Sequence, residues 1–331
     1  MISFIIIGRN ERWKLTKCID SVYQAIKYNS IDSYEVIYVD SQSSDDSLER
    51  AKQNPNTKVF QITGTVNAAI ARNIGAKESK GNILFFIDGD MEIEADFLPH
   101  VLNENGDLIY DCVTGHLNDL CYDTDDNLLC ELTRTYDGTL PKYSQKLTAN
   151  GGIFIIKREC WEKVGGMRTK YRRSQDLDLT IRLNNIGVET IRIPFLITKH
   201  HTVDYLNEKR MWKFLFSGDD FYSAVLFKHH LLNYEVVFRT ARSFYTSFLL
   251  LFSIVLIPIS FKLFLFFIIL YILGLIVKVY SNTLRAASGM NKLLYFFERL
   301  AFQFIRDVLF WFAIFFFFPG SKDTKYVNLG Y

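Results

Sequence analysis

The amino-acid sequence predicts an α/β protein in which a mostly parallel sheet, flanked by helices, precedes a set of C-terminal membrane or interfacial helices. Three observations predict this class. Short apolar runs alternate with amphipathic stretches over about the first 220 residues. Two of these runs end in aspartate, at Asp40 and Asp88. Beyond residue 240 the chain becomes almost wholly apolar.

Each element of the sheet follows from a local pattern. Alternating strands and helices favour parallel strands covered on both faces, and ligand sites of such sheets lie beyond the carboxyl ends of the strands. Asp40 and Asp88 should therefore share one edge. Gly81 suits the C-terminal cap of the helix that precedes the Asp88 strand. The expected strands are Ile2–Ile7, Val36–Val39, Lys58–Ile62 and Asn82–Ile87, and the expected helices are Glu11–Lys27, one from about Asp46, and Asn67–Lys80.

Composition excludes some classes of protein. The formal net charge of the 331 residues is +2, which implies no general attraction to nucleic acid. The five cysteines are scattered without a Cys-x-x-Cys motif. Cys121 and Cys130 are near enough in sequence to pair, but free thiols in a reducing cytoplasm are the favoured interpretation.

The apolar C-terminal third predicts a membrane hairpin. Phe244–Ile257 and Leu263–Val277 are apolar runs separated by a turn at Pro258, each at or below the roughly 20 residues of a spanning helix. A buried helix pair of a soluble domain is the alternative, disfavoured by a single charge in about thirty residues. The first half of Leu293–Phe318 suits an interfacial helix, and its apolar second half, Val308–Phe318, either spans or re-enters.

Basic residues flank this hairpin and predict its orientation. By the positive-inside rule both ends face the cytoplasm and the Pro258 turn lies outside. We therefore expect a multi-pass protein of the cell inner (plasma) membrane whose first domain is cytoplasmic. The flanking residues are Arg239, Arg242, Lys278, Arg285 and Lys292.

Asp88-Gly89-Asp90 is the most informative motif, because two carboxylates at i and i+2 directly follow a buried strand. Carboxylates bind Mg²⁺ or Mn²⁺, and these ions also take phosphate oxygens, so the motif can neutralise a diphosphate leaving group. A chance surface turn is the alternative. Either imidazole of His200-His201 can supply a third ligand, and we select His201 for the metal set, although a surface histidine pair is commoner.

Other residues are candidates for substrate contacts. Asp40 can accept the N3–H of uracil, or cap the next helix. Arg72 can pair with a diphosphate, or lie on a solvated helix face. Asn150-Gly151-Gly152 suits a close approach of backbone to ligand. The second Asp-x-Asp, Asp123–Asp125, is interpreted as a hairpin turn.

A helix that begins near Ser174 carries the candidate general base. Ser174 suits its N-cap, and Asp176 and Asp178 lie in the first turn, where acidic residues interact favourably with the helix dipole. A transferase that acts on a hydroxyl needs a base, and Asp176 is placed for that role.

In this order and spacing the motifs resemble those of the inverting glycosyltransferase family 2, over about residues 2–220. Gly8, Asn10 and Glu11 stand in its nucleotide loop. Gly8 replaces the usual proline, and Gln175 replaces the usual glutamate beside Asp176. The matching segments are Phe4–Glu11, Val39–Asp45, Ala71–Gly75, Phe85–Asp90, Asn150–Gly152, Val164–Gly166 and Gln175–Leu179.

The resemblance implies a Rossmann-like GT-A fold and single-displacement transfer from a nucleotide sugar, with UDP favoured. It implies that Asp88 and Asp90 engage metal and diphosphate, that Asp40 contacts the base, and that Asp176 is the general base. The segment Lys209–Trp212 only faintly resembles the motif of processive synthases, which argues against a polymerase.

We therefore expect a membrane-anchored hexosyltransferase that acts on a lipid-linked (polyprenyl) glycan in cell-surface polysaccharide assembly. Direct transfer to polyprenyl phosphate and a non-catalytic scaffold are alternatives. A dinucleotide-dependent oxidoreductase lacks its Gly-x-Gly-x-x-Gly motif. The phenylalanine-rich helices also offer surface for a homo-oligomer. The expected regions are 1–220 (catalytic), 221–242 (linker), 243–280 (hairpin) and 281–331 (amphipathic helix, third segment and tail).

Overall fold

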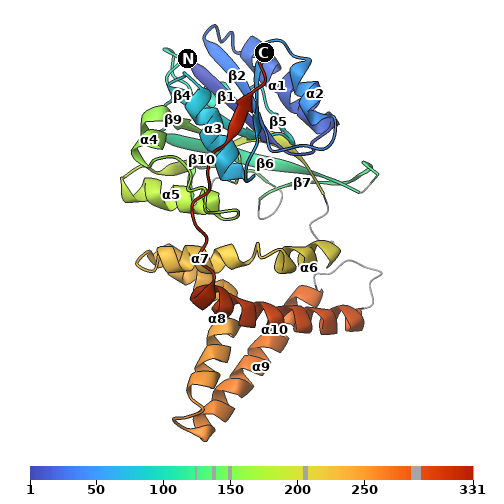
Figure 1. Cartoon of the computed structure of the whole chain (residues 1–331), viewed down its shortest axis with the longest axis vertical. Coiled ribbons are helices and arrows are strands. Elements are labelled where there is room, and N and C mark those ends of the chain that lie inside the picture. Colours follow the sequence, from blue (N-terminus) through green and yellow to red (C-terminus); the bar gives the residue numbers. More distant parts are fainter. Residues whose placement is uncertain (124, 136–138, 148–150, 204–207, 285–291, 331) are drawn as a thin grey trace. The chain divides into compact units, whose positions relative to one another are not determined.

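The computed structural model describes residues 1–123, 125–135, 139–147, 151–203, 208–284 and 292–330. The chain divides into two compact units. We call them the sheet unit, Met1–Leu206 with Gly320–Tyr331, and the helical unit, Asn207–Pro319 (Figure 1). Arg285 and the side chains of Lys209 and Arg210 lie outside the described part.

The first half of the sheet unit has the expected parallel strands. Strands β3, β2, β1 and β4 lie in that order, and each neighbouring pair is parallel. Helices α1 and α3 pack on opposite faces, because alternate residues of β1 face opposite ways. The elements are β1 (Ile2–Gly8), α1 (Trp13–Tyr28), β2 (Tyr34–Asp40), α2 (Ser47–Lys52), β3 (Thr57–Ile62), α3 (Ala68–Glu78) and β4 (Ile83–Asp88).

The second half makes the sheet mixed. Strand β9 pairs antiparallel with both β4 and β6, whereas β6 and β10 are parallel. The predicted α/β class is confirmed, with a parallel half that carries Asp40 and Asp88. The further elements are β5 (Met91–Ile93), η1 (Leu98–His100), β6 (Cys112–Tyr122), β7 (Leu128–Thr133), β8 (Gln145–Leu147), β9 (Phe154–Lys157), α4 (Arg158–Lys163), α5 (Gln175–Asn185) and β10 (Thr190–Val203).

Helix α3 positions the Asp88 strand. Its N-cap is Asn67, whose side chain accepts a hydrogen bond from the Ile70 amide. It ends at Glu78 with Ser79 as the cap residue, so Gly81 is not the predicted cap. Gly81 instead lies against the first strand, where a Cβ would come 2.5 Å from Ser3 Oγ.

The C-terminal tail returns to the sheet unit. Strand β11 (Tyr326–Asn328) pairs antiparallel with the edge strand β3 (Figure 1). The Tyr326 ring packs edge-on against Phe60, and its hydroxyl donates to Glu78. The tail therefore belongs with the first domain and covers an otherwise open sheet edge.

The helical unit contains the predicted hairpin. Helices α8 and α9 pack together, and α8 is kinked at Phe244 (Figure 1). Within the described residues, only Phe261–Ser281 in α9 is long and apolar enough to cross a membrane by length and composition. The helices are α6 (Glu208–Phe216), α7 (Phe221–His229), α8 (Tyr234–Val255), α9 (Phe261–Leu284) and α10 (Lys292–Phe316).

Candidate active site

The carboxyl ends of β1, β2 and β4 bring the predicted acidic residues to one edge of the sheet. Asp88 ends β4, and Gly89 turns the chain so that its amide donates to Ile7 O at 2.7 Å. A Cβ on Gly89 would lie 3.1 Å from Glu11 Cγ and 3.3 Å from Ile7 O. The middle glycine thus lets the Asp88–Asp90 turn pack close to the first strand.

Arg72 holds Asp88 in place. Its Nη2 lies 2.6 Å from Asp88 Oδ1 and donates to Gly152 O at 3.1 Å, and the arginine is only 2% exposed. Gly152 has a φ of +92°, and a Cβ there would come 2.5 Å from Asp88 Oδ2. The structure therefore joins three predicted residues, with Arg72 buried rather than on a solvated helix face. Asn150, beside this loop, lies outside the described residues.

The carboxylates at this edge destabilise one another's charged forms. Burial, reinforced by the neighbouring Asp90, raises the pKa of Glu11 to about 8. Burial also raises the pKa of Asp88 to about 6, although Arg72 opposes the rise. A cation at this edge would relieve both effects.

His200, rather than its neighbour, faces the acidic motif. His200 Nε2 lies 3.3 Å from Asp90 Oδ2, and its Nδ1 lies 2.7 Å from Asp119 Oδ1. Arg134 in turn forms an ion pair with Asp119. The imidazole is buried between two carboxylates, and Asp119 orients it toward Asp90.

His201, the histidine selected from the sequence, points elsewhere. Its Nε2 lies 3.0 Å from Glu92 Oε2, and its Nδ1 lies 3.0 Å from the Tyr122 hydroxyl. The Trp13 ring packs edge-on against it. Because successive side chains of a strand face opposite ways, only one of the two histidines of β10 can reach Asp90. The sequence contains no signal that identifies which one.

The side chains at this edge supply some of the ligands that a divalent cation needs, but not a full set. In the described ranges, no group of three or more His, Cys, Asp or Glu side chains forms a complete metal cage. Asp90 and His200 nevertheless offer an oxygen and a nitrogen side by side, and the carboxyl groups of Asp88 and Glu11 lie close enough to Asp90 to affect its electrostatics. Mg²⁺ and Mn²⁺ bind in such sites with water and substrate phosphate completing their ligands.

Asp40 lies beneath the two loops that border the site. Its carboxylate is fully buried and accepts hydrogen bonds from Tyr38 Oη at 3.1 Å, Ser43 N at 3.0 Å and Gln61 Nε2 at 3.0 Å. The hydrogen bond from Ser43 N to Asp40 also supports the loop after β2, and this loop contacts the loop after β1. Direct contact between Asp40 and a base remains a prediction.

The loop after β1 is joined to the loop after β2. Asn10, at a positive φ of 61°, donates from its amide to Ser43 Oγ at 3.0 Å and accepts from Ser44 N at 2.7 Å. The Gly8 carbonyl accepts from Ser41 N at 2.9 Å. Between the loops lies a cavity of about 300 Å³, lined by Asn10, Glu11, Arg12, Trp13, Lys14, Ser44, Asp45 and Asp126.

The two carboxylates in the first turn of α5, Asp176 and Asp178, have different surroundings. Asp178 is fully buried, with Arg168 Nη1 at 3.1 Å and Arg182 Nε at 2.8 Å. Asp176 is only partly buried. Ser174 occupies the N-cap position at a φ of 61°, but its side chain makes no capping hydrogen bond. Asp178 is thus a structural ion-pair residue, whereas Asp176 is the more exposed of the two and its role as the general base stays a prediction.

The second Asp-x-Asp motif is a turn, as predicted. The hairpin between β6 and β7 closes through Asp123 N, which donates to Asn127 O at 3.0 Å. Asp123 Oδ1 accepts from the Asp125 and Asn127 amides. Cys121 and Cys130 face each other across these strands as thiols, with no disulfide between them.

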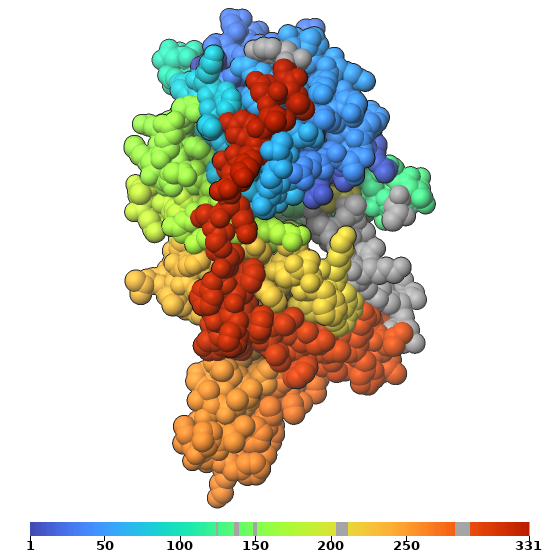
Figure 2. Space-filling model, in the orientation of Figure 1, coloured from blue at the N-terminus to red at the C-terminus, as the bar shows by residue number. Residues whose placement is uncertain are grey.

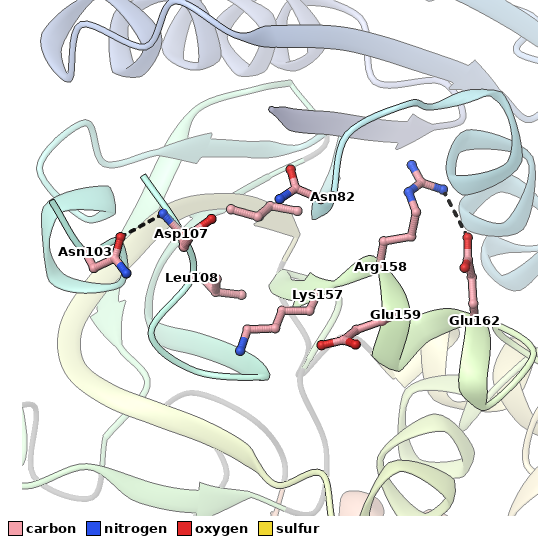
Figure 3. Close-up of a pocket in the computed structure, with 9 residues that line it drawn as sticks. Asn82, Asn103, Asp107, Leu108, Lys157, Arg158, Glu159 and Glu162 are labelled. Carbon is pink, nitrogen blue, oxygen red and sulfur yellow. Dashed lines mark hydrogen bonds and ion pairs between the residues drawn. The ribbon is translucent and has the colours of Figure 1, made fainter. Parts of the chain in front are cut away.

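A larger cavity lies at the opposite edge of the sheet. It measures about 620 Å³ (Figure 3). Asn82 and Lys157 border it where β4 begins and β9 ends, and Arg158 donates to Gly81 O and Ala76 O. None of the predicted site residues lines it, so it is separate from the acidic edge.

Comparisons with known proteins point to one family. A family model for glycosyl transferase family 2 matches residues 3–165. An uncharacterized glycosyltransferase of Haemophilus influenzae is 25% identical over 194 residues, which cover 55% of this chain and 62% of that protein. Glycosyltransferase AglE of Haloferax volcanii is 34% identical over 93 residues, 27% of this chain and 30% of that protein. The chain thus spans less than two thirds of either relative.

Solved structures give weaker matches. GalNAc-T7 with UDP, GalNAc and Mn²⁺ has a TM-score of 0.48 at 17% identity, covering 61% of this chain and 44% of that one. Staphylococcus aureus TarS 1–349 in complex with UDP-GlcNAc has a TM-score of 0.44 at 14% identity, covering 61% and 58%.

Proposed function

Because this chain belongs to glycosyltransferase family 2 through its residues 3–165, we propose that it transfers a sugar, with inversion, from a nucleotide sugar to a lipid-linked acceptor. The observation that carries the proposal is the acidic edge. Arg72 holds Asp88 there, and Asp90 lies beside His200. Such an edge suits the binding of a cation together with a diphosphate.

Asp90 and His200 would hold the cation, and Asp88 would face the diphosphate beside it. Imidazole favours transition-metal ions, so this pair favours Mn²⁺ over Mg²⁺. When bound, the ion supplies charge neutralisation for the departing diphosphate. Arg72 fixes the Asp88 carboxylate, and the Gly151-Gly152 backbone, at φ values of +63° and +92°, leaves room beside it.

The donor nucleoside would occupy the cavity between the loops after β1 and β2. The cavity offers polar atoms from Asn10, Ser44 and Asp45. Asp40 would accept the N3–H of uracil if its own hydrogen bonds from Ser43 N and Gln61 Nε2 opened. UDP is therefore the nucleotide that we propose, with GDP as the comparison.

Asp176 would act as the general base. It would take the proton of the acceptor hydroxyl as that oxygen attacks the anomeric carbon from the face opposite the diphosphate. The bond from the sugar to the diphosphate breaks in the same step, and the configuration inverts. The ion pairs of Asp178 with Arg168 and Arg182 hold the first turn of α5 in position.

The acceptor would be a polyprenyl-linked glycan in the plasma membrane, reached from the cytoplasmic side. The apolar helix Phe261–Ser281 supports membrane association. Membrane association would confine the protein and a lipid-linked acceptor to the same plane, which raises the rate at which they meet. This advantage supports a lipid-linked acceptor over a soluble one.

The experiment measures transfer by the full chain in detergent from UDP- and GDP-sugars with Mn²⁺. Three acceptors are compared: a polyprenyl-diphosphate-linked glycan, bare polyprenyl phosphate, and a soluble glycan. We expect transfer to the lipid-linked glycan and a loss of at least about 100-fold in Asp176→Asn, the size of a general-base contribution. Equal transfer to the soluble glycan would overturn the proposed acceptor, and an unimpaired Asp176→Asn would overturn the proposed base.

A further inference from the structure

We propose that the helical unit enters a lipid bilayer from one side and returns to that same side. In this arrangement α8 and α9 form a re-entrant hairpin whose tip stays inside the bilayer, and α10 lies along the interface. The inference deepens the membrane association on which the proposed function rests. It differs from the expected topology, in which the Pro258 turn lies outside and Val308–Phe318 spans or re-enters.

The C-terminal tail limits the number of membrane crossings. Strand β10 ends at Val203, before the helical unit, and β11 follows that unit, yet both strands belong to the one sheet. Leu329 N also donates to Val59 O at 2.9 Å. Because a folded sheet lies on one side of a membrane, the chain between the two strands must cross an even number of times. A single crossing by α9 is therefore excluded for any membrane-bound state.

The hairpin is shorter than a full crossing on its α8 side. Past the kink, the apolar run Phe244–Ile257 has 14 residues and reaches about 21 Å at 1.5 Å per residue, against a hydrocarbon core of about 30 Å. Figure 2 shows the hairpin projecting from the rest of the helical unit. Because the shorter α8 arm sets the depth that the turn can reach, the hairpin ends within the bilayer, although α9 alone is long enough to cross.

The composition of the tip agrees with that depth. Ile257, Ile259 and Phe261 are 51%, 70% and 65% exposed around the Pro258 turn. A tip that emerged on the far side would place these apolar side chains in water. The single charge of the tip, Lys262, has a long side chain that can reach toward a headgroup region.

Charged residues lie at the base of the hairpin. Arg239 and Arg242 precede the kink at Phe244, where α8 changes direction. On α9, Lys278 Nζ donates to Ser243 O at 2.7 Å, so it lies at the same level. The charges therefore mark one plane, which suits the interface through which both helices enter.

Hydrogen bonds to α8 hold α10 beside the base of the hairpin. Thr246 Oγ1 donates to Asp307 Oδ1 at 3.0 Å, and Ser247 Oγ donates to Asp307 O at 2.7 Å. Trp311 Nε1 donates to Ser247 O at 2.8 Å. Helix α10 thus crosses α8 directly past the kink and runs transverse to the hairpin (Figure 1). A helix fixed across the base lies along the interface and does not span.

The experiment is site-specific labelling of the full chain in oriented membrane vesicles with a membrane-impermeant maleimide. The exposed Cys130 reports the side of the sheet unit. In a Cys130→Ser background, Ser321→Cys reports the tail and Ile259→Cys reports the tip. We expect Cys130 and Ser321→Cys to label from the same side, and Ile259→Cys to label from neither side until detergent is added.

Three results would overturn the proposal. Labelling of Ser321→Cys from the side opposite to Cys130 would show an odd number of crossings. Labelling of Ile259→Cys from the opposite side would show a spanning hairpin. Labelling of Ile259→Cys from the same side as Cys130 would show that the tip lies outside the bilayer. Sugar transfer is measured on the same variants, because labelling tests the membrane topology and transfer tests the proposed function. Either one can fail without the other.

Discussion

At the scale of single residues, His200 is held between Asp90 and Asp119, and Arg134 pairs with Asp119. A carboxylate behind a metal-binding imidazole fixes its orientation and raises its basicity. In the proposed site Asp119 is therefore a positioning residue, because it lies on the far side of the His200 imidazole from Asp90. Hydrogen bonds from His200 and Arg134 outweigh burial and lower the pKa of Asp119, so this carboxylate is charged at neutral pH.

The first prediction concerns Asp119→Asn. We expect about 10- to 100-fold weaker Mn²⁺ binding, the range found when such supporting carboxylates are replaced. Isothermal titration calorimetry of the full chain with Mn²⁺ measures it. The matched control is Asp111→Asn, which removes an exposed ion pair with Lys157 on another part of the sheet. Unchanged Mn²⁺ affinity in Asp119→Asn would show that His200 is not oriented in this way.

Arg72 gives the second prediction at this scale. Its Nη2 donates to both Asp88 and Gly152 O while its Nη1 contacts Met167 Sδ, and a lysine has only one nitrogen with which to make these contacts. We expect Arg72→Lys to fold but to lose more than about 10-fold in transfer rate, or about 1.4 kcal/mol of transition-state stabilisation. Initial rates measure the change, beside circular dichroism as the check on folding. Full activity in the lysine variant would argue that Asp88 needs no fixed partner.

At the scale of elements, the sequence pattern predicted the parallel half of the sheet well. β1, β2 and β4 are apolar runs bounded by polar loops, and their carboxyl ends carry the predicted residues. The tail strand β11 could not be predicted, because its pairing with β3 joins residues more than 250 positions apart. His200 could not be separated from His201, since that choice depends on the register of β10.

A buried carboxylate at the other end of β1 and β2 gives a pH prediction. Burial alone would raise the pKa of Glu35, but hydrogen bonds from Lys80 N, Ser3 Oγ and Lys58 Nζ outweigh burial and lower it below 4.5. A carboxylate with a lowered folded-state pKa contributes stability above its unfolded-state pKa, and that stability is lost as pH falls through the folded-state pKa.

We therefore expect Glu35→Gln to destabilise the protein at pH 7 by about 1–3 kcal/mol, because the neutral amide weakens the charge-assisted hydrogen bonds and turns an N–H toward Lys58 Nζ. The difference from the parent protein should narrow as pH falls below 4.5. Thermal melting in detergent across this range measures it, with the exposed Glu159→Gln as control. A difference that stays constant with pH would contradict the assignment.

At the scale of the whole molecule, two units share one chain, and the sheet unit contains residues from both sides of the helical unit. The composition after residue 240 predicted membrane helices. It could not show that the chain returns to the first sheet, and this return is what limits the crossings to an even number. The helical unit is thus inserted between β10 and β11 of the unit that carries the candidate active site.

The central claim is that Asp88, Asp90 and His200 form a cation-assisted site for a nucleotide sugar. The measurement that tests it most directly is donor turnover by the full chain with Mn²⁺ or with EDTA, in the parent protein, Asp90→Asn and Asp125→Asn. Asp125 belongs to the second Asp-x-Asp, in the exposed hairpin turn, and is the matched control. We predict turnover that EDTA abolishes, that Asp90→Asn lowers at least about 100-fold, and that Asp125→Asn leaves unchanged. Turnover that persists in EDTA, or an Asp90→Asn variant as active as Asp125→Asn, would contradict the account.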